Sequence, residues 1–185
     1  DDAAAILIQA WRRAQQEDEI LHLGPQHFKV TNVEHFPGPD YAMLAMVEPA
    51  PEAGLRFLSP ASFRQGPGDL PLPLPVNVFR GPYQSWQAFA PDHLALPGDW
   101  LGWCAENVFV IRHRVHTVPV TLDNRESFVG FVGEATFAAL DDALLYQGAL
   151  QSVAHLAPYC GIGRKTTMGM GAVERIETEA EERRP

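Results

Sequence analysis

Apolar and polar residues follow two different periods along this chain, and the period distinguishes its helices from its strands. Apolar residues spaced by three and four predict amphipathic helices, whereas alternation of apolar and polar residues predicts strands. The helical period occupies residues 6–14, 76–89, 99–106 and 141–156. Strands are expected over residues 28–33, 41–48, 55–58, 107–122, 128–137 and 170–176.

From residue 55 the main elements run strand, helix, strand, strand, helix, strand. This order is the split βαβ arrangement of a ferredoxin-like fold. We therefore assign residues 51–178 to an α+β, ferredoxin-like (RRM-like) βαββαβ domain, with a linker over residues 48–54 at its start. Residues 66–75 are rich in proline and are expected to run extended over the surface. The charged tail, residues 179–185, is expected to fray.

One predicted helix carries apolar side chains, most of them aromatic, at helical spacing: Val76, Phe79, Tyr83, Trp86 and Phe89. Gly81 and Pro82 weaken the helical signal in its middle. Exposed aromatic rings could stack on nucleic-acid bases, but the helical spacing favours packing into a core. We therefore expect these side chains to be buried.

The predicted strand 107–122 alternates in a way that bears on function. Its even positions hold Val108, Val110, Arg112, Arg114, His116, Val118 and Val120. Because successive side chains of a strand point to opposite faces, these residues should share one face. The cations would then lie roughly 6.5 Å apart, a spacing that suits an RNA backbone; a solvated outer face is the alternative. His113 and His116 should point to opposite faces, which excludes them as a pair of metal ligands.

Residues 161–171 read GIGRKTTMGMG, with two Gly-x-Gly pairs around a segment that holds adjacent cations and hydroxyls. Glycine allows positive φ and close approach to a ligand, and successive backbone N–H groups in such turns can hold an anion. Arg164 is suited to bidentate contacts with phosphate. We interpret the segment as a cradle for a phosphodiester backbone, and the alternative is a glycine-rich hairpin that binds nothing.

Two familiar phosphate-binding motifs are excluded in this segment. A Walker loop requires lysine directly after glycine, whereas Arg164 separates Gly163 from Lys165. A dinucleotide fingerprint requires a third glycine where this chain has Thr166. Both motifs also lead from a strand into a helix, and here the expected order is reversed.

Composition and charge narrow the class of protein. The net charge of −9 over 185 residues argues against nucleic acid as a partner, but much of the acid is clustered at residues 17–19 and 174–182. No apolar run is long enough to span a membrane. Cys104 and Cys160 form no Cys-x-x-Cys pair, so we expect two buried, reduced thiols in a cytoplasmic protein.

Several segments together resemble the C-terminal half of CRISPR repeat-processing endoribonucleases, the sixth class of Cas protein in the RAMP superfamily. The matching segments are residues 55–64 (LRFLSPASFR), 72–75 (LPLP), 129–134 (VGFVGE) and 161–171. They occur in the same order as in that family, and the last of them carries its most specific motif.

This resemblance implies two tandem ferredoxin-like domains, of which residues 1–50 would be the end of the first. It implies prokaryotic CRISPR RNA processing without metal or cofactor, in which a 2′-hydroxyl attacks the adjacent phosphate and leaves a 2′,3′-cyclic phosphate. The family's catalytic histidine lies early in the first domain, and the chain starts without Met inside a predicted helix, so we expect it upstream of Asp1. His116 and Lys165 are then the candidates for catalytic roles in this chain.

The RNA-binding residues expected on this basis are Arg112, Arg114, Gly161, Gly163, Arg164, Lys165, Thr166, Gly169 and Gly171. The expected partners are precursor CRISPR RNA, other CRISPR effector subunits and a second copy of the chain in a homodimer. Two alternatives stay open. One is a non-catalytic RNA-binding RAMP subunit of an effector complex, and the other is a ferredoxin-like interaction domain that binds no RNA.

Overall fold

The computed structural model describes residues 2–35, 38–123 and 126–178. The chain forms two compact units, residues 1–38 and 39–185. Among the helices in the described ranges, none has the length and apolar character that crossing a bilayer requires.

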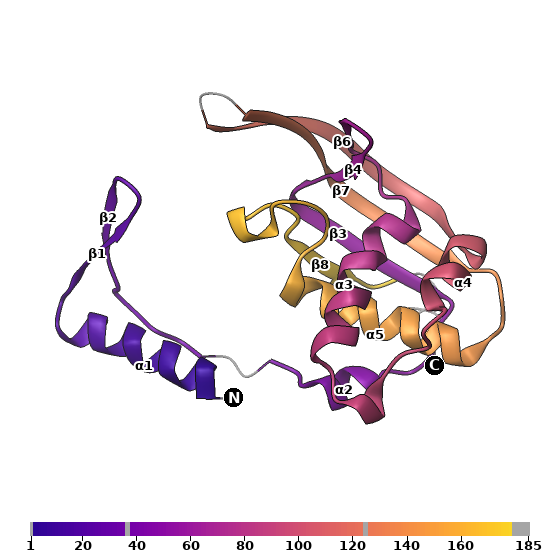
Figure 1. The fold of residues 1–185 in the computed structure, drawn as a ribbon, viewed down its shortest axis with the longest axis horizontal. Helices are drawn as coiled ribbons and strands as arrows, with labels where there is room; N and C mark the ends of the chain where they lie inside the picture. Colours follow the sequence, from indigo (N-terminus) through magenta and orange to yellow (C-terminus); the bar gives the residue numbers. More distant parts are fainter. Residues whose placement is uncertain (1, 36–37, 124–125, 179–185) are drawn as a thin grey trace. The chain divides into compact units, whose positions relative to one another are not determined.

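The first unit consists of a helix followed by a hairpin (Figure 1). Helix α1 spans Asp2–Gln16 and confirms the helical period near the N-terminus, and β1 (Ile20–Leu23) pairs antiparallel with β2 (Gln26–Lys29). Trp11 of α1 packs against Phe28, with ring centroids 6.3 Å apart. Strand β2 is shorter than the strand expected over residues 28–33 and begins two residues earlier. Its partner, β1, was not predicted.

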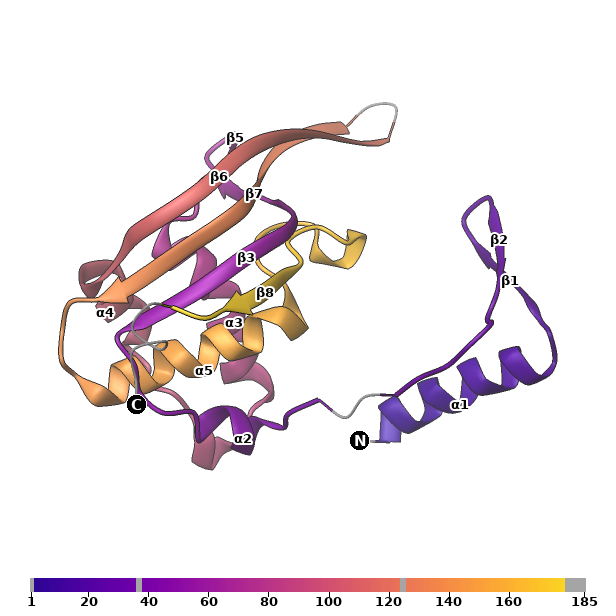
Figure 2. The ribbon, with the colours of Figure 1, turned by 180° about the vertical axis from the view of Figure 1, so that it is seen from behind.

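The second unit is built on a four-stranded antiparallel sheet in the order β6-β7-β3-β8. Its strands are β3 (Glu52–Ala61), β6 (Val108–Asp123), β7 (Glu126–Ala139) and β8 (Val173–Ile176). Helices α3 (Pro75–Phe89) and α5 (Leu144–Cys160) cover one face and leave the other free of helices (Figures 1 and 2). The order β3-α3-β6-β7-α5-β8 confirms the ferredoxin-like fold.

The second unit also contains several shorter helices, turns and strands. They are α2 (Tyr41–Ala45), the hairpin of β4 (Phe63–Gln65) and β5 (Gly68–Leu70), α4 (Trp100–Asn107), and two short 3₁₀ turns, η1 (Asp92–Leu94) and η2 (Thr166–Met168). Strand β5 lies within the segment expected to be extended, and α3 starts at its last proline, Pro75, where the missing N–H costs no helical hydrogen bond.

The core forms between the sheet and its helices. Leu55 and Phe57 of β3 are buried, whereas the alternate residues Arg56 and Leu58 are exposed. This is the alternation expected of a strand with one face on the core. Phe79, Tyr83 and Trp86 of α3 are buried as predicted. The prediction is wrong for Phe89, which is 75% exposed near the end of the helix.

The strand expected over residues 41–48 is wrong, because its first half is helix α2. The Asp40 side chain accepts a hydrogen bond from the Met43 N–H at 2.8 Å and so caps the helix. Leu44 is buried between α2 and the neighbouring helices. In a segment this short, the cap and one buried side chain outweigh the apparent alternation.

The last helix also differs from expectation at both ends. It begins at Leu144 rather than at Asp141, whose carboxylate accepts a hydrogen bond from the Ala143 N–H just before the helix. It also continues through Pro158 to Cys160. Proline removes one helical hydrogen bond, and so close to the end the helix tolerates this loss before Gly161, at φ 72°, terminates it.

Strand β6 contains a bulge that divides its even positions between the two faces. Val110 pairs with Phe137, but Arg112 pairs with Thr136, so the register shifts by one residue at Ile111. Val108 and Val110 consequently face the core. Arg112, Arg114 and His116 share the opposite, helix-free face, as predicted, whereas the expectation that all even positions share one face is wrong. The predicted turn at Asp123 and Asn124 lies partly outside the described residues.

Candidate nucleic-acid interface

Residues 161–171, which we call the glycine loop, connect the end of α5 to the start of β8. Hydrogen bonds fix this loop to the end of β3. The Arg164 N–H donates to the Ser62 carbonyl at 3.0 Å, and the Gly171 N–H donates to the Pro60 carbonyl at 3.1 Å. The Ser59 hydroxyl donates to the Gly169 carbonyl at 2.8 Å. The loop is therefore held in one shape before any ligand binds.

Most glycines of the loop are required by the protein's own packing. A Cβ at Gly171 would lie 1.8 Å from the Ile162 carbonyl oxygen, and one at Gly163 would lie 2.5 Å from that of Ser62. Gly169 is different, because a Cβ there would meet nothing within 4 Å. Close backbone approach thus occurs within the protein at Gly163 and Gly171, whereas Gly169 lies where a ligand could come close.

The two adjacent cations of the loop have different surroundings. The Arg164 guanidinium forms an ion pair with Asp69 of β5 and is still one-third exposed. Lys165 is half-buried and takes a left-handed backbone conformation, with φ 60°, at the start of η2, which contains Thr166. The loop therefore presents a paired arginine beside a lysine whose position is set by the turn.

Arg112, Arg114 and His116, which we call the cationic stripe, are all exposed on the helix-free face of the sheet. Arg112 and Arg114 line a shallow hollow together with Glu134 and Thr136. His116 lines a second hollow beside Leu58 of β3. His113 and His116 pair with Ala135 and Val132, positions three residues apart on β7, and so lie on opposite faces as expected. In the described part of the chain no group of three or more His, Cys, Asp or Glu side chains could hold a metal ion.

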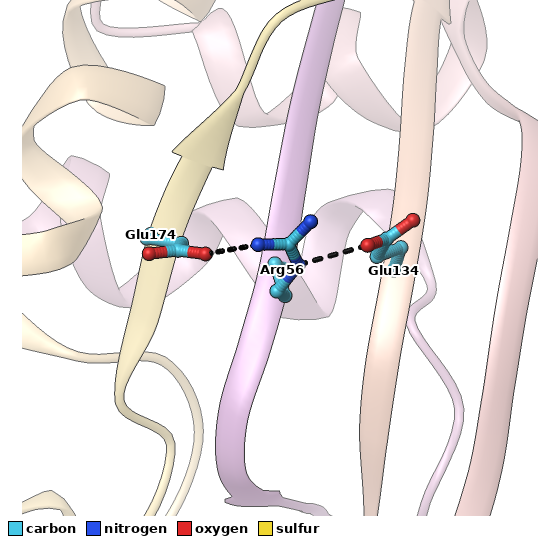
Figure 3. Close-up of polar contacts among 3 residues, drawn as sticks. All are labelled: Arg56, Glu134 and Glu174. Carbon is cyan, nitrogen blue, oxygen red and sulfur yellow. Dashed lines mark hydrogen bonds and ion pairs between the residues drawn. The ribbon is translucent and has the colours of Figure 1, made fainter.

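A row of alternating charges crosses the same face and was not predicted. Arg56 of β3 donates through Nε to Glu134 of β7 at 2.8 Å and through Nη1 to Glu174 of β8 at 2.6 Å (Figure 3). These bonds raise the pKa of Arg56, the contact with Glu134 contributing most. Arg114 lies opposite Glu134 on the next strand. The carboxylates therefore offset part of the positive charge that the stripe brings to this face.

Only the strand register could have revealed this row. Arg56, Glu134 and Glu174 are far apart in the sequence and belong to three different strands. They meet because Arg56 is paired with Glu134 on one side and with Glu174 on the other. Periodicity places each residue on a face of its own strand but does not fix its neighbours across the sheet.

The stripe and the glycine loop lie at the same end of the sheet but at opposite edges. The Ala172 carbonyl, just after the loop, accepts the Leu58 N–H, and Leu58 lines the same hollow as His116. Strands β7 and β3 separate β6 from β8, a distance of roughly 14 Å at normal strand spacing. Arg164 lines a hollow beside α3, on the helix-covered side. An RNA that contacts both features must pass around the end of the sheet.

Comparisons with known proteins agree with this architecture. A family model described as CRISPR-associated endoribonuclease Cas6 matches residues 55–173, which include the stripe and the glycine loop. A Cas6 product complex shares 27% identity with a TM-score of 0.78, covering 91% of this chain and 71% of that one. A second Cas6 product complex gives 25% identity and a TM-score of 0.80, covering 91% and 69%.

A Thermus thermophilus Cas6 structure gives 27% identity and a TM-score of 0.67, covering 75% of this chain but only 58% of that one. The comparison with curated proteins gives no match.

Proposed function

The chain belongs to the family of CRISPR-associated endoribonucleases Cas6, and from this premise we propose that it binds precursor CRISPR RNA and cuts it within the repeat. The observation that carries the proposal is the family match over residues 55–173, which spans the whole glycine loop with its adjacent cations. The fixed shape of the loop supports it, because a preorganised cation site stabilises phosphate charge without reorganising during the reaction. Residues 1–50 would be the end of a first ferredoxin-like domain.

The proposed cleavage is a transesterification within the RNA. The 2′-hydroxyl oxygen attacks the adjacent phosphorus, the bond from phosphorus to the 5′-oxygen breaks, and a 2′,3′-cyclic phosphate and a 5′-hydroxyl result. A base takes the proton of the 2′-hydroxyl, and an acid supplies one to the leaving 5′-oxygen. His116 is the candidate for proton transfer, and Lys165 is the candidate for stabilising charge on the phosphate.

Cleavage tests this function directly. In EDTA, with a panel of end-labelled CRISPR repeat RNAs, the protein should cut its own repeat at one position and leave a cyclic phosphate. A single 2′-deoxy substitution at that position should abolish cleavage while leaving binding nearly unchanged, because only the nucleophile is removed. Cleavage that survives the 2′-deoxy substitution would contradict the mechanism. Binding without cleavage would favour a non-catalytic RNA-binding subunit.

The proposed RNA contacts can be tested by the salt dependence of binding. Lys165→Ala and Arg112→Ala should each weaken repeat binding and lower the slope of log affinity against log salt by about 1. The reason is that a phosphate no longer contacted by the protein keeps its counterion instead of releasing it. Val118→Thr, on the same face as Arg112 but uncharged, should change neither quantity. Fluorescence anisotropy at several salt concentrations gives both numbers. Equal behaviour of the arginine and valine variants would mean that the stripe is ordinary solvated surface.

A further inference from the structure

A continuous groove runs along α3 on the helix-covered side of the second unit, and we call it the α3 groove. It consists of two adjoining hollows that share Gly81, Gln84 and Gly163. The first is also lined by Arg64, Asn77, Arg80 and Arg164. The second extends it past Ser85, Cys160 and Thr166 to Phe89.

Three arginines line one end of the groove, and none of the residues that line it is acidic. Arg80 is exposed and makes no ion pair with any residue in the described part of the chain. Arg64 donates through Nε to the Gly66 carbonyl at 2.9 Å rather than to a carboxylate. Arg164 alone is paired, with Asp69. Since the chain as a whole is acidic, this end of the groove is a local concentration of positive charge suited to phosphate.

The other end of the groove is uncharged and aromatic. Phe89 is 75% exposed, although Phe79, Tyr83 and Trp86 on the same helix are buried. Cys160 is half-buried, so the prediction of two buried thiols holds for Cys104 and is wrong for Cys160. Its partial burial still raises the pKa of the thiol, so that it adds no negative charge to the groove. Phe89 lies nine positions after Arg80, a rise of roughly 13 Å along the helix axis. The groove thus combines cations at one end with a free aromatic ring at the other.

We propose that the α3 groove binds a single-stranded segment of the RNA, its phosphates at Arg64, Arg80 and Arg164 and one base stacked on Phe89. This inference rests on the proposed function and extends it to RNA outside any base-paired part of the repeat. Single strands are held by cations along their backbone together with aromatic rings that stack on their bases. A base inside a duplex is already stacked on its neighbours and offers no free face to Phe89.

The test uses one RNA hairpin in two forms, blunt-ended and with a single-stranded uridine extension. For the wild-type protein the extension should tighten binding about tenfold, the scale of one stacked base. Arg80→Ala and Phe89→Ala should each remove most of that gain and leave affinity for the blunt hairpin unchanged. Phe109→Ala and Arg12→Ala, which alter exposed residues outside the groove, serve as matched controls and should keep the full gain.

A second measurement locates the strand. An extension that carries 5-iodouridine should form a photo-crosslink to the peptide that contains Phe89. A crosslink confined to the helix-free face of the sheet would overturn the proposal, as would equal loss of affinity for both hairpins or an unchanged gain in the groove variants.

Lys165→Ala separates failure of this inference from failure of the proposed function. If that variant weakens binding of both hairpins while the groove variants behave like wild type, only the groove is refuted. If the wild-type protein binds neither these hairpins nor the repeat panel, both the proposed function and the proposed role of the groove are refuted.

Discussion

Gly171→Ala should lower the free energy of unfolding by about 3–5 kcal/mol, whereas Gly169→Ala should lower it by only about 1 kcal/mol. Both glycines have positive φ, 66° and 83°, so both variants bear the cost of placing a side chain in the left-handed region. They differ in space, because a Cβ at Gly171 would overlap the Ile162 carbonyl oxygen, whereas a Cβ at Gly169 meets nothing within 4 Å.

The loss of stability is larger for Gly171→Ala because the backbone and side chain of Ile162 must move. The Ile162 N–H donates to the Gly171 carbonyl at 2.9 Å, and the Ile162 side chain is fully buried. Relieving the overlap would break this hydrogen bond and displace a core side chain, in addition to the backbone strain. Urea denaturation of the two variants measures the difference. Equal losses of stability would show that the loop relaxes freely and that the contact between Gly171 and Ile162 does not hold it in one shape.

The same contrast explains how far the sequence could predict the glycine loop. Its composition identified it as a special backbone conformation, and the positive φ values of its glycines agree. The sequence did not reveal that Gly163 and Gly171 face backbone of the protein itself. That depends on the fold bringing Ser62 against Gly163, and on the loop closing on itself so that Ile162 faces Gly171, which no local pattern specifies.

The order of the main elements was predictable because each long helix or strand repeats its period several times. Predictions failed where one residue decided the outcome. The bulge at Ile111 turns Val110 and Arg112 to opposite faces although their spacing in the sequence is two. The Asp40 cap makes a helix of a short apolar segment. The charge row around Arg56 needed the strand register, which only the complete sheet provides.

Helix α3 shows the limit of periodicity within a single element. Its aromatic residues share one spacing, yet Trp86 is fully buried and Phe89 is 75% exposed. Trp86 lies in a cluster with Leu44 and Leu156, where three helices meet, whereas the helix ends at Phe89. The spacing places both rings on similar sides of the helix, but only the position of α2 and α5 determines how far along the helix the core extends.

Trp86→Ala should therefore lower the free energy of unfolding by about 3–5 kcal/mol, the cost of truncating a large buried aromatic side chain. The ring packs edge-on against Tyr41 of α2, with centroids 5.1 Å apart, and its Nε1–H donates to the Leu94 carbonyl at 2.8 Å. Both contacts disappear in the variant. Hydrogen exchange should also show that the amides of α2 lose protection before those of the sheet, because Trp86 joins α2 to α3.

Phe89→Ala is the matched control, three residues away on the same helix. Its exposed ring should contribute within about 0.5 kcal/mol to stability. Thermal or urea denaturation of both variants measures the contrast. A destabilisation by Phe89→Ala as large as that by Trp86→Ala would show that Phe89 packs within the protein, and a loss of RNA affinity in that variant would then reflect damage to the fold. If Phe89→Ala keeps its stability but loses the gain in affinity from the single-stranded extension, the Phe89 ring contacts the RNA and does not pack in the core.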